Sequence, residues 1–496
     1  MKKSKIIVLI ISVLLTLCLF AACAESTGGS NQAETEQNAA AELAEIEAAE
    51  IEEIKILPDI PGNLDLGGYK FRLIYEKSDN YDWATKGIEA EEETGDPIND
   101  AAYRRNEYVT DKYNFEIVGI PYQVYNLGST NIRRLVQAGT DDFDAVILRQ
   151  GEAPALITTG AFVDVRNVPY IDLEKPWWDE KIMNQLSIEG RKYAVFGDFI
   201  VAANDAIRIL MFNKQIHRDS GLENLYELVK TGRWTIDTFY NVSKDVSADL
   251  NGDGIMDTRD RYGLLLQRGS VVCFMFGAGV NTTSKDSSDL PGLSIGDERS
   301  LLVLQKIHEA VNAPNLAIFD SEFPNTWADL QIAFENNQGL LFGEVLQLAE
   351  RMRASDTDFG ILPFPKFDEI QESYFAFADS RCINHIFIPI TNHNLVETGQ
   401  ILEILSAESY YTVRPAYYEK SLTGKFVRDE ESSEMLDIIL ANKIVSMDEM
   451  FNWGMLNAVS DALTSPGPDF VSVIERQFQR TEAAIQRTVN NILDLD

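Results

Sequence analysis

The sequence predicts an α/β protein with two lobes. At 496 residues the chain is too long for one ordinary domain, and a hydrophobic content of 45% provides for a sizeable core. Predicted strands and helices alternate from Tyr69 to about Val165, which is typical of a mainly parallel sheet. Further along, Lys192–Lys214 has the pattern of a chain that passes from one lobe to another.

This crossing stretch combines β-rich runs with a polar joint. Two short runs, Lys192–Phe196 and Phe199–Ala203, flank a Gly-Asp turn and are each predicted to be extended. Asn204 and Asp205 form the joint, and an apolar strand follows at Ala206–Phe212. An ordinary buried hairpin is the alternative interpretation of the same spacing.

The arrangement, which closes in Phe212-Asn213-Lys214, resembles the lobe-crossing segment of bacterial extracellular solute-binding proteins of the sugar-binding type. These are the maltodextrin-binding-protein-like components of ABC importers. The resemblance covers most of the chain after Leu57 through many weak matches, among them Arg105-Asn106-Glu107, Pro176-Trp177-Trp178 and Ser406–Tyr410. It implies a two-lobed periplasmic-binding-protein-like (type II) α/β fold with mixed sheets and hinge crossings.

The same resemblance implies a function and a division of the chain. We expect a monomeric, non-enzymatic receptor that captures a carbohydrate between its lobes and delivers it to the permease of an ABC importer. The expected first lobe comprises residues 57–203 and 374–420, and the second comprises 204–373 and 421–496 with C-terminal helices. The expected hinge segments are Ala203–Ala206, Ile370–Tyr374 and the region of Lys420.

The N-terminal residues are typical of a lipoprotein leader. A basic start and an apolar run, Ile6–Phe20, precede Ala21-Ala22-Cys23, which resembles a bacterial lipobox with Phe20 in place of the usual Leu. We therefore predict a signal peptide at residues 1–22, lipidation of Cys23, and an acidic tether over residues 23–56 at the extracellular face of the cell membrane. An ordinary secretory leader cut after Ala22 is the alternative.

Charge and motifs narrow the function classes. The formal net charge of −35 disfavours nucleic acid and anionic lipid headgroups as partners. No GxSxG, GxxxxGK[ST], GxGxxG or HExxH motif is present, and the four histidines are scattered. A secreted glycoside hydrolase needs only two carboxylates and stays open as an alternative, as does a glycan-adhesive lipoprotein.

Candidate ligand residues follow two strands of the expected first lobe. Tyr81 and Trp83 come after the strand Tyr69–Glu76, and Arg149 and Gln150 end the next buried strand. Ligands of open α/β folds bind beyond the carboxyl ends of strands, and aromatic rings there can stack on a sugar face. For Trp83, packing beneath the next helix is the alternative.

Four further candidates lie along the rest of the chain. Asp205 is part of the polar joint, and Asn281 lies in a loop expected to edge the cleft. Glu344 follows the strand Gly339–Gly343 at a helix start, where the resembling family places sugar contacts; an ordinary first-turn acid is the alternative. Trp453 precedes a glycine in a loop and is either a ligand platform or a core residue.

The most specific motif predicts a calcium loop. It has the pattern D-x-N-x-D-G-x-x-D-x-x-D and is similar to the loops of EF-hands and dockerin modules, although it ends in Asp instead of Glu. The predicted oxygen donors are Asp249, Asn251, Asp253, Asp257, Asp260 and the carbonyl of Ile255. We predict a structural Ca²⁺, with a metal-free turn cluster as the alternative.

The two remaining cysteines allow two interpretations. Cys273 and Cys382 are either a disulfide or two buried thiols.

Overall fold

A computed structural model of the chain describes residues 55–77, 86–88, 90–122, 128–352, 355–422 and 430–495, and only the backbone of 419–422. The chain separates into two compact units, Met1–Leu57 and Pro58–Asp496, and the second contains all of the described helices and strands. The predicted leader, Cys23, Tyr81 and Trp83 lie outside the described residues.

The first sheet confirms the predicted alternation of strands and helices that begins at Tyr69. Its strand order is β12-β3-β1-β2. The bounds are β1 (Tyr69–Glu76), β2 (Phe115–Tyr122), β3 (Ala145–Arg149) and β12 (Asn384–Phe387). The first three strands are parallel and β12 is antiparallel to β3, so Glu76, Tyr122 and Arg149 end at the same edge of the sheet.

The second sheet is mixed and has the order β10-β4-β9-β5-β8. Its strands are β4 (Arg208–Asn213), β5 (Tyr262–Leu266), β8 (Ala317–Phe319), β9 (Gly339–Val345) and β10 (Phe359–Leu362). Because β4 is antiparallel to β9, its first residue, Arg208, pairs with Val345 at the carboxyl end of β9. A two-stranded pair, β11 (Ala376–Phe377) with β13 (Lys443–Ile444), and a hairpin of β6 (Thr283–Lys285) with β7 (Pro291–Leu293) complete the strands.

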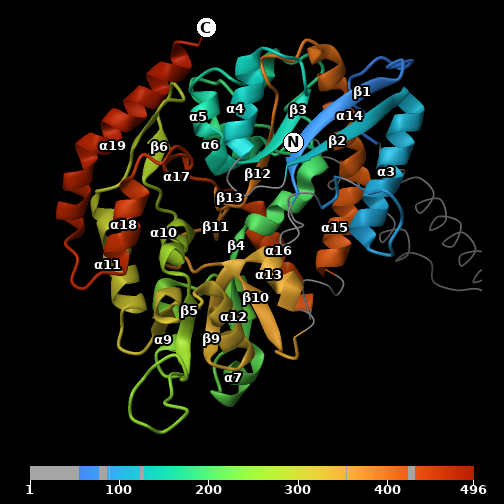
Figure 1. Ribbon diagram of the computed structural model, residues 1–496. Coiled ribbons are helices and arrows are strands. Elements are labelled where there is room, and N and C mark those ends of the chain that lie inside the picture. Colours follow the sequence, from blue (N-terminus) through green and yellow to red (C-terminus); the bar gives the residue numbers. More distant parts are fainter. Residues whose placement is uncertain are drawn as a thin grey trace, which may run out of the picture. The chain divides into compact units, whose positions relative to one another are not determined.

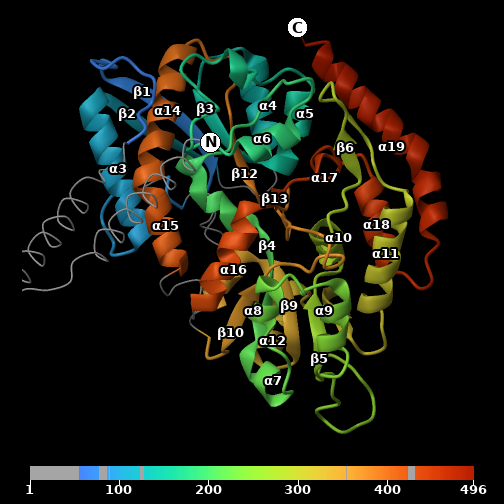
Figure 2. The same ribbon diagram turned by 180° about the vertical axis from the view of Figure 1, so that it is seen from behind.

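Helices cover both sheets, which with their helices form the first and the second lobe (Figures 1 and 2). The first lobe contains α3 (Pro97–Tyr113), α4 (Gly128–Ala138), α5 (Pro154–Ile157), α6 (Glu180–Leu186), α14 (Leu395–Tyr411) and α15 (Val413–Leu422). The second sheet is flanked by α7 (Lys214–Asp219), α8 (Leu225–Lys230), α9 (Ile236–Ser243), α12 (Trp327–Glu335), α13 (Leu346–Arg351) and α16 (Glu430–Ala441). The remaining helices are α10 (Val272–Gly277), α11 (Glu298–Val311), α17 (Met447–Phe451), α18 (Met455–Leu463) and α19 (Phe470–Leu493).

Local sequence signals fix the ends of α3. The Asp96 side chain accepts hydrogen bonds from the backbone N–H groups of Ile98 and Asn99, and Pro97 occupies the first helical turn. Within α3, the buried Arg105 donates to Ser409 Oγ of α14 at 2.9 Å. Two of the segments that carry the family resemblance are therefore direct neighbours in the fold.

The crossing stretch differs from its prediction. Lys192–Phe196 makes only an isolated bridge to β12, through Val195, and Asp198–Ala206 is a 3₁₀ helix, η3, instead of a strand. Every residue of η3 after Asp198 is buried. Because such a run has no polar face, its hydrophobic periodicity cannot distinguish a helix from a strand. The strand was predicted from its β-branched residues alone. The predicted strand that follows is confirmed as β4.

The C-terminal helix α19 packs against both lobes. Its first turns, with Phe470 and Ile474, belong to the hydrophobic core of the second sheet together with α18. Its last turns, with Ile485 and Val489, belong to a core formed with one face of the first sheet. Among the described residues, no helix is both long and apolar enough to cross a membrane.

Candidate functional site

Two segments that link the lobes meet at the carboxyl edge of the second sheet. The first is η3, which leads into β4 at Arg208. The second is the return from β10 to β12, whose residue Ala378 bridges to Ile207. The expected hinge Ala203–Ala206 lies within η3, and Ile370–Tyr374 lies on the return segment. These segments place residues of both lobes around one region.

A cavity of about 220 Å³, which we call the cleft cavity, opens in this region. The strand ends contribute Arg208, Gln267, Glu344 and Val345. The helices α12 and α13 contribute Trp327, Gln347, Leu348 and Arg351, and the return segment contributes Arg381 and Cys382. The carboxyl ends of β5 and β9 point at the cavity, which is the usual position of ligand sites in open α/β sheets.

Arg208 organises the polar floor of the cleft cavity. It is buried and donates to Asp379 Oδ2 through Nε at 3.1 Å and through Nη2 at 2.6 Å. Arg381 donates to the same carboxylate at 2.8 and 2.6 Å. Burial raises the pKa of Asp379, but the charges of Arg208 and Arg381 outweigh burial and hold that pKa well below its usual range. Asp379 therefore stays ionised and keeps both guanidinium groups in place.

Glu344 is the predicted ligand residue that lines this cavity. Its Oε2 accepts a hydrogen bond from the backbone N–H of Val345 at 2.8 Å and lies 3.5 Å from Arg208 Nη1. Its Oε1 accepts from the side chain of Gln267. Glu344 is the penultimate residue of β9, which extends past the predicted end at Gly343, and α13 begins two residues later at Leu346. The alternative of a first-turn acid of this helix is therefore wrong.

Arg149 and Gln150 lie beside this region but do not line the cleft cavity. Arg149 is buried and forms ion pairs with Glu76 at 3.1 Å and Glu152 at 3.2 Å. Gln150 is fully buried, and neither atom of its amide has a hydrogen-bond partner among the described residues. The adjoining Gly151 donates its backbone N–H to Ser380 O at 2.9 Å, which ties the end of β3 to the return segment.

Asp205 joins the two lobes through an ion triad. Its carboxylate, buried in η3, accepts from Lys86 Nζ at 3.1 Å and from the hydroxyl of Tyr417 at 2.8 Å. Lys86, which follows β1, also pairs with Glu350 of α13 at 2.5 Å. Burial raises the pKa of Asp205, and the charge of Lys86 opposes that rise. The triad therefore connects a loop of the first lobe, η3 and a helix of the second lobe.

Asn281 and Trp453 are not brought to the cleft cavity. Asn281 lies just before β6, and its backbone carbonyl accepts from Ser294 Oγ at 3.1 Å. Trp453 is buried, stacks on Phe451 with ring centroids 5.4 Å apart, and donates its indole N–H to Thr488 of α19 at 2.9 Å. These contacts favour the core alternative for Trp453.

Sequence reasoning missed most of the cationic and aromatic lining. Trp327, at the start of α12, is 42% exposed, and Arg208, Arg351 and Arg381 come from three distant parts of the chain. Gln267 could have been found from the sequence, because it directly follows the predicted strand Tyr262–Leu266. Nothing local in the sequence marks the arginines.

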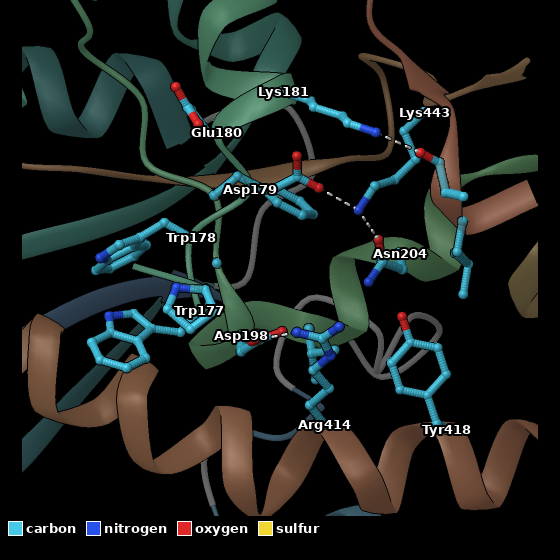
Figure 3. Close-up of a pocket in the computed structure, with 16 residues that line it drawn as sticks. Trp177, Trp178, Asp179, Glu180, Lys181, Asp198, Asn204, Arg414, Tyr418 and Lys443 are labelled. Atoms are coloured by element: carbon cyan, nitrogen blue, oxygen red, sulfur yellow. Dashed lines mark hydrogen bonds and ion pairs between the residues drawn. The ribbon is translucent and has the colours of Figure 1, made fainter. Parts of the chain in front are cut away.

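A second cavity, of about 340 Å³, lies between η3, α6, α15 and β13 (Figure 3). Its charged groups pair with one another. Lys443 contacts Asp179 at 2.5 Å and Asn204 at 3.1 Å, and Arg414 contacts Asp198 at 3.3 Å. These pairs connect α6 and η3 to the segments that flank them. We therefore regard the cleft cavity as the better candidate for ligand binding.

The two tryptophans beside this second cavity are packing anchors, as expected from the Pro-Trp-Trp motif. Trp177 and Trp178 are buried, and their indole N–H groups both donate to Glu403 of α14, at 3.1 and 2.9 Å. Burial raises the pKa of Glu403 to about 7, although both indole hydrogen bonds act in the opposite direction. A Cβ at Gly197 would lie 2.5 Å from the Trp178 ring, so glycine is required there for the close approach.

The predicted calcium loop is folded as an acidic turn cluster. Asp249 accepts from the backbone N–H groups of Gly252 and Gly254 at 2.6 and 2.7 Å. Arg259 pairs with both Asp253 and Asp257, at 2.8 and 2.6 Å. Among the described residues, no group of three or more His, Cys, Asp or Glu side chains is arranged to hold a metal. The donors as placed do not fit Ca²⁺, and calcium binding stays a prediction that requires Arg259 to move away.

The two cysteines of the body are free thiols in the structure. Cys273 is buried in α10, and Cys382 lies half-buried at the cleft cavity. Burial raises the pKa of Cys273 to about 12, so this thiol is not a nucleophile at neutral pH.

Comparison with known proteins supports the fold through structure alone. No family model matches the sequence, and no curated protein matches it. A sugar transporter protein of Rhizobium etli in an open conformation covers 84% of this chain and 99% of its own, with 14% identity and a TM-score of 0.54. UgpB of Mycobacterium tuberculosis in complex with glycerophosphocholine covers 85% and 99%, with 12% identity and a TM-score of 0.52.

An ABC substrate-binding protein of Listeria monocytogenes in complex with cycloalternan covers 86% of this chain and 98% of its own, with 10% identity and a TM-score of 0.50. At such identities the likeness establishes the fold and nothing finer. The described chain therefore has the two-lobed, periplasmic-binding-protein-like α/β fold of ABC-importer solute-binding proteins, as the resemblance of its sequence implies.

Proposed function

We propose that this protein is a lipid-anchored, extracellular solute-binding receptor that captures a carbohydrate between its lobes and delivers it to an ABC importer. The fold supports the receptor class, because the matching structures are binding proteins of importers. The lipobox-like sequence supports anchoring through Cys23. The protein acts as a monomer that meets its permease at the membrane surface.

The observation that carries the proposal is the composition of the cleft cavity. It combines a half-exposed tryptophan, Trp327, with the polar side chains of Gln267 and Glu344 at the strand ends and of Gln347 in α13. An aromatic face packs on the apolar face of a sugar ring, and the polar groups hydrogen-bond its hydroxyls. This mixture of one apolar face and many hydrogen-bonding groups matches a saccharide better than an apolar ligand.

Closure of the lobes completes the proposed mechanism. The triad of Lys86, Asp205 and Glu350 holds the loop after β1 against α13. A ligand bound in the neighbouring cleft cavity would favour the closed arrangement of the lobes. The triad would favour the same arrangement when it forms. The ligand would then be buried by hinge motion, as in other two-lobed binding proteins.

A glycoside hydrolase is the less favoured alternative. Hydrolysis requires two carboxyl groups on either side of the glycosidic bond. Among the described residues that line the cleft cavity, Glu344 is the single carboxylate, and it is already engaged by Gln267, Val345 and Arg208. No observation favours an adhesive role.

A thermal-shift screen tests the proposal. The mature chain carrying Cys23→Ser is heated with a panel of mono- and oligosaccharides, and the reducing-end products are measured in the same wells. A saccharide that raises the melting temperature and remains intact supports a receptor, because a ligand that binds only the folded state stabilises it. Trp327→Ala should abolish the shift while leaving the ligand-free melting temperature unchanged. A consumed saccharide would instead establish a hydrolase.

A further inference from the structure

The charge of the cleft cavity is opposite to that of the chain. The chain has 78 acidic and 43 basic residues. Among the described residues, the lining of the cleft cavity nevertheless contains three arginines, Arg208, Arg351 and Arg381, and a single carboxylate, that of Glu344. A cationic lining in so acidic a protein indicates a selective role, because the average surface of this chain repels anions.

The acidic partner that Arg208 and Arg381 share lies beneath them. The side chain of Asp379, which holds Arg208 and Arg381, is 0% exposed, whereas that of Arg381 is 54% exposed. Glu344 is buried as well, and Arg351 is exposed at the end of α13. A ligand that enters the cavity therefore meets guanidinium groups, while the Asp379 carboxylate that orients two of them is out of its reach.

One guanidinium N–H group at the cavity floor is buried without a hydrogen bond. Nη1 of the buried Arg208 makes no hydrogen bond among the described residues and only approaches Glu344 Oε2, at 3.5 Å. Leaving a charged donor unsatisfied in a buried position is costly. An anionic oxygen from a ligand would satisfy it, and the planar guanidinium fork suits the paired oxygens of carboxylate, phosphate and sulfate.

We propose that the cleft cavity selects an acidic saccharide, whose anionic group binds Arg208, Arg351 and Arg381 while a sugar ring stacks on Trp327. This inference rests on the proposed receptor function and adds the ligand class. The shared chemistry is an anionic oxygen group on a sugar, supplied by a uronate carboxylate, a phosphate ester or a sulfate ester. Neutral saccharides offer Arg208 only an uncharged acceptor and should bind more weakly.

The test compares ligands that differ only in charge. Calorimetric titration of the mature Cys23→Ser chain compares three pairs of ligands. They are trigalacturonate with its full methyl ester, galactose 6-phosphate with galactose, and galactose 6-sulfate with galactose. The acidic member of at least one pair should bind at least about tenfold more tightly, which corresponds to about 1.4 kcal/mol. Which pair discriminates identifies the source of the anionic group. The preference should shrink at high salt, because exposed charges are screened.

Variants assign the preference to the arginines. Arg381→Gln and Arg351→Gln should each reduce the ratio of acidic to neutral affinity. Arg218→Gln is the matched control, since Arg218 is an exposed arginine paired with Asp358 at 2.9 Å outside the cavity, and it should change neither affinity. A ligand-free thermal melt confirms that each variant is folded.

The outcomes separate the two proposals. Equal affinity for the acidic and neutral members of every pair would overturn the charge inference and leave the carbohydrate receptor standing. A preference that survives in both arginine variants would overturn the assigned residues. Binding of no saccharide of either kind would overturn the acidic-saccharide inference together with the carbohydrate function.

Discussion

Replacing Lys86 by methionine should destabilise the fold far more than removing an ordinary surface lysine. Methionine keeps nearly the length of the lysine side chain but removes its charge. The Asp205 carboxylate, whose side chain is 0% exposed, is then left without its cation. Removing one partner of a buried ion pair costs about 3–5 kcal/mol. The hydroxyl of Tyr417 still donates to Asp205 at 2.8 Å, so we expect a loss near the lower end, about 3 kcal/mol.

Urea denaturation of the mature Cys23→Ser chain measures this loss. Lys70→Met is the control, because Lys70 is 68% exposed in its pair with Glu116 and exposed pairs contribute about 0.2–1 kcal/mol. In the double variant Lys86→Met with Asp205→Asn, at least half of the loss should be recovered, since the fully buried carboxylate of the triad is no longer charged. A Lys86→Met loss no larger than that of the control, or no recovery in the double variant, would refute the triad.

The pH dependence gives an independent check. Burial raises the folded-state pKa of Asp205, and Lys86 opposes this, so removal of Lys86 raises the pKa further. The folded variant then holds a proton that the unfolded chain releases, and its stability falls as pH rises. The deficit of Lys86→Met relative to the parent should therefore shrink as pH falls from about 8 to about 5.5. A deficit that grows over this range would contradict the assignment.

Three further predictions concern other parts of the chain. Trp453→Ala should lower the free energy of unfolding by about 3–5 kcal/mol, because it empties a buried site between α17 and α19; lost ligand binding at unchanged stability would restore Trp453 as a ligand platform. If the acidic loop binds Ca²⁺, the melting temperature of the parent should rise with calcium over chelator, and Asp253→Ala should abolish that rise; identical parent melts in calcium and chelator would remove the metal. Cys23→Ser should release the protein from the membrane fraction, and retention there would mean that the leader was misinterpreted.

The site predictions depended on strand ends and on a polar joint, and their role in ligand binding stays a prediction. Glu344 was predicted from a strand followed by a helix start, and it lines the cleft cavity. Asp205 was predicted from the polar joint and lies where the lobes are tied together. Trp453 was a candidate because a tryptophan before a glycine suggests an exposed loop, yet α19 covers it. Burial by a distant helix leaves no local trace in sequence.

The crossing stretch shows the limit of periodicity. Its last strand was predictable because a run of apolar residues ends in Asn213, which caps the following helix through a hydrogen bond to the N–H of Ile216. The residues before it are buried on every side, so strand and 3₁₀ helix bury the same apolar surface. The segment is a helix because its backbone groups hydrogen-bond within the segment, as Ile207 N does to Asn204 O at 3.0 Å.

Outside the crossing stretch, the sequence by itself determined most of the order of strands and helices and the parallel start of the first sheet, because these follow from local hydrophobic patterns and caps. Tertiary structure alone decided the charge of that cleft. Arg208 and Asp379 are 171 residues apart in the chain and share two hydrogen bonds. Their meeting depends on how η3, β9 and the return segment pack together, and packing between distant segments is a property of the whole fold.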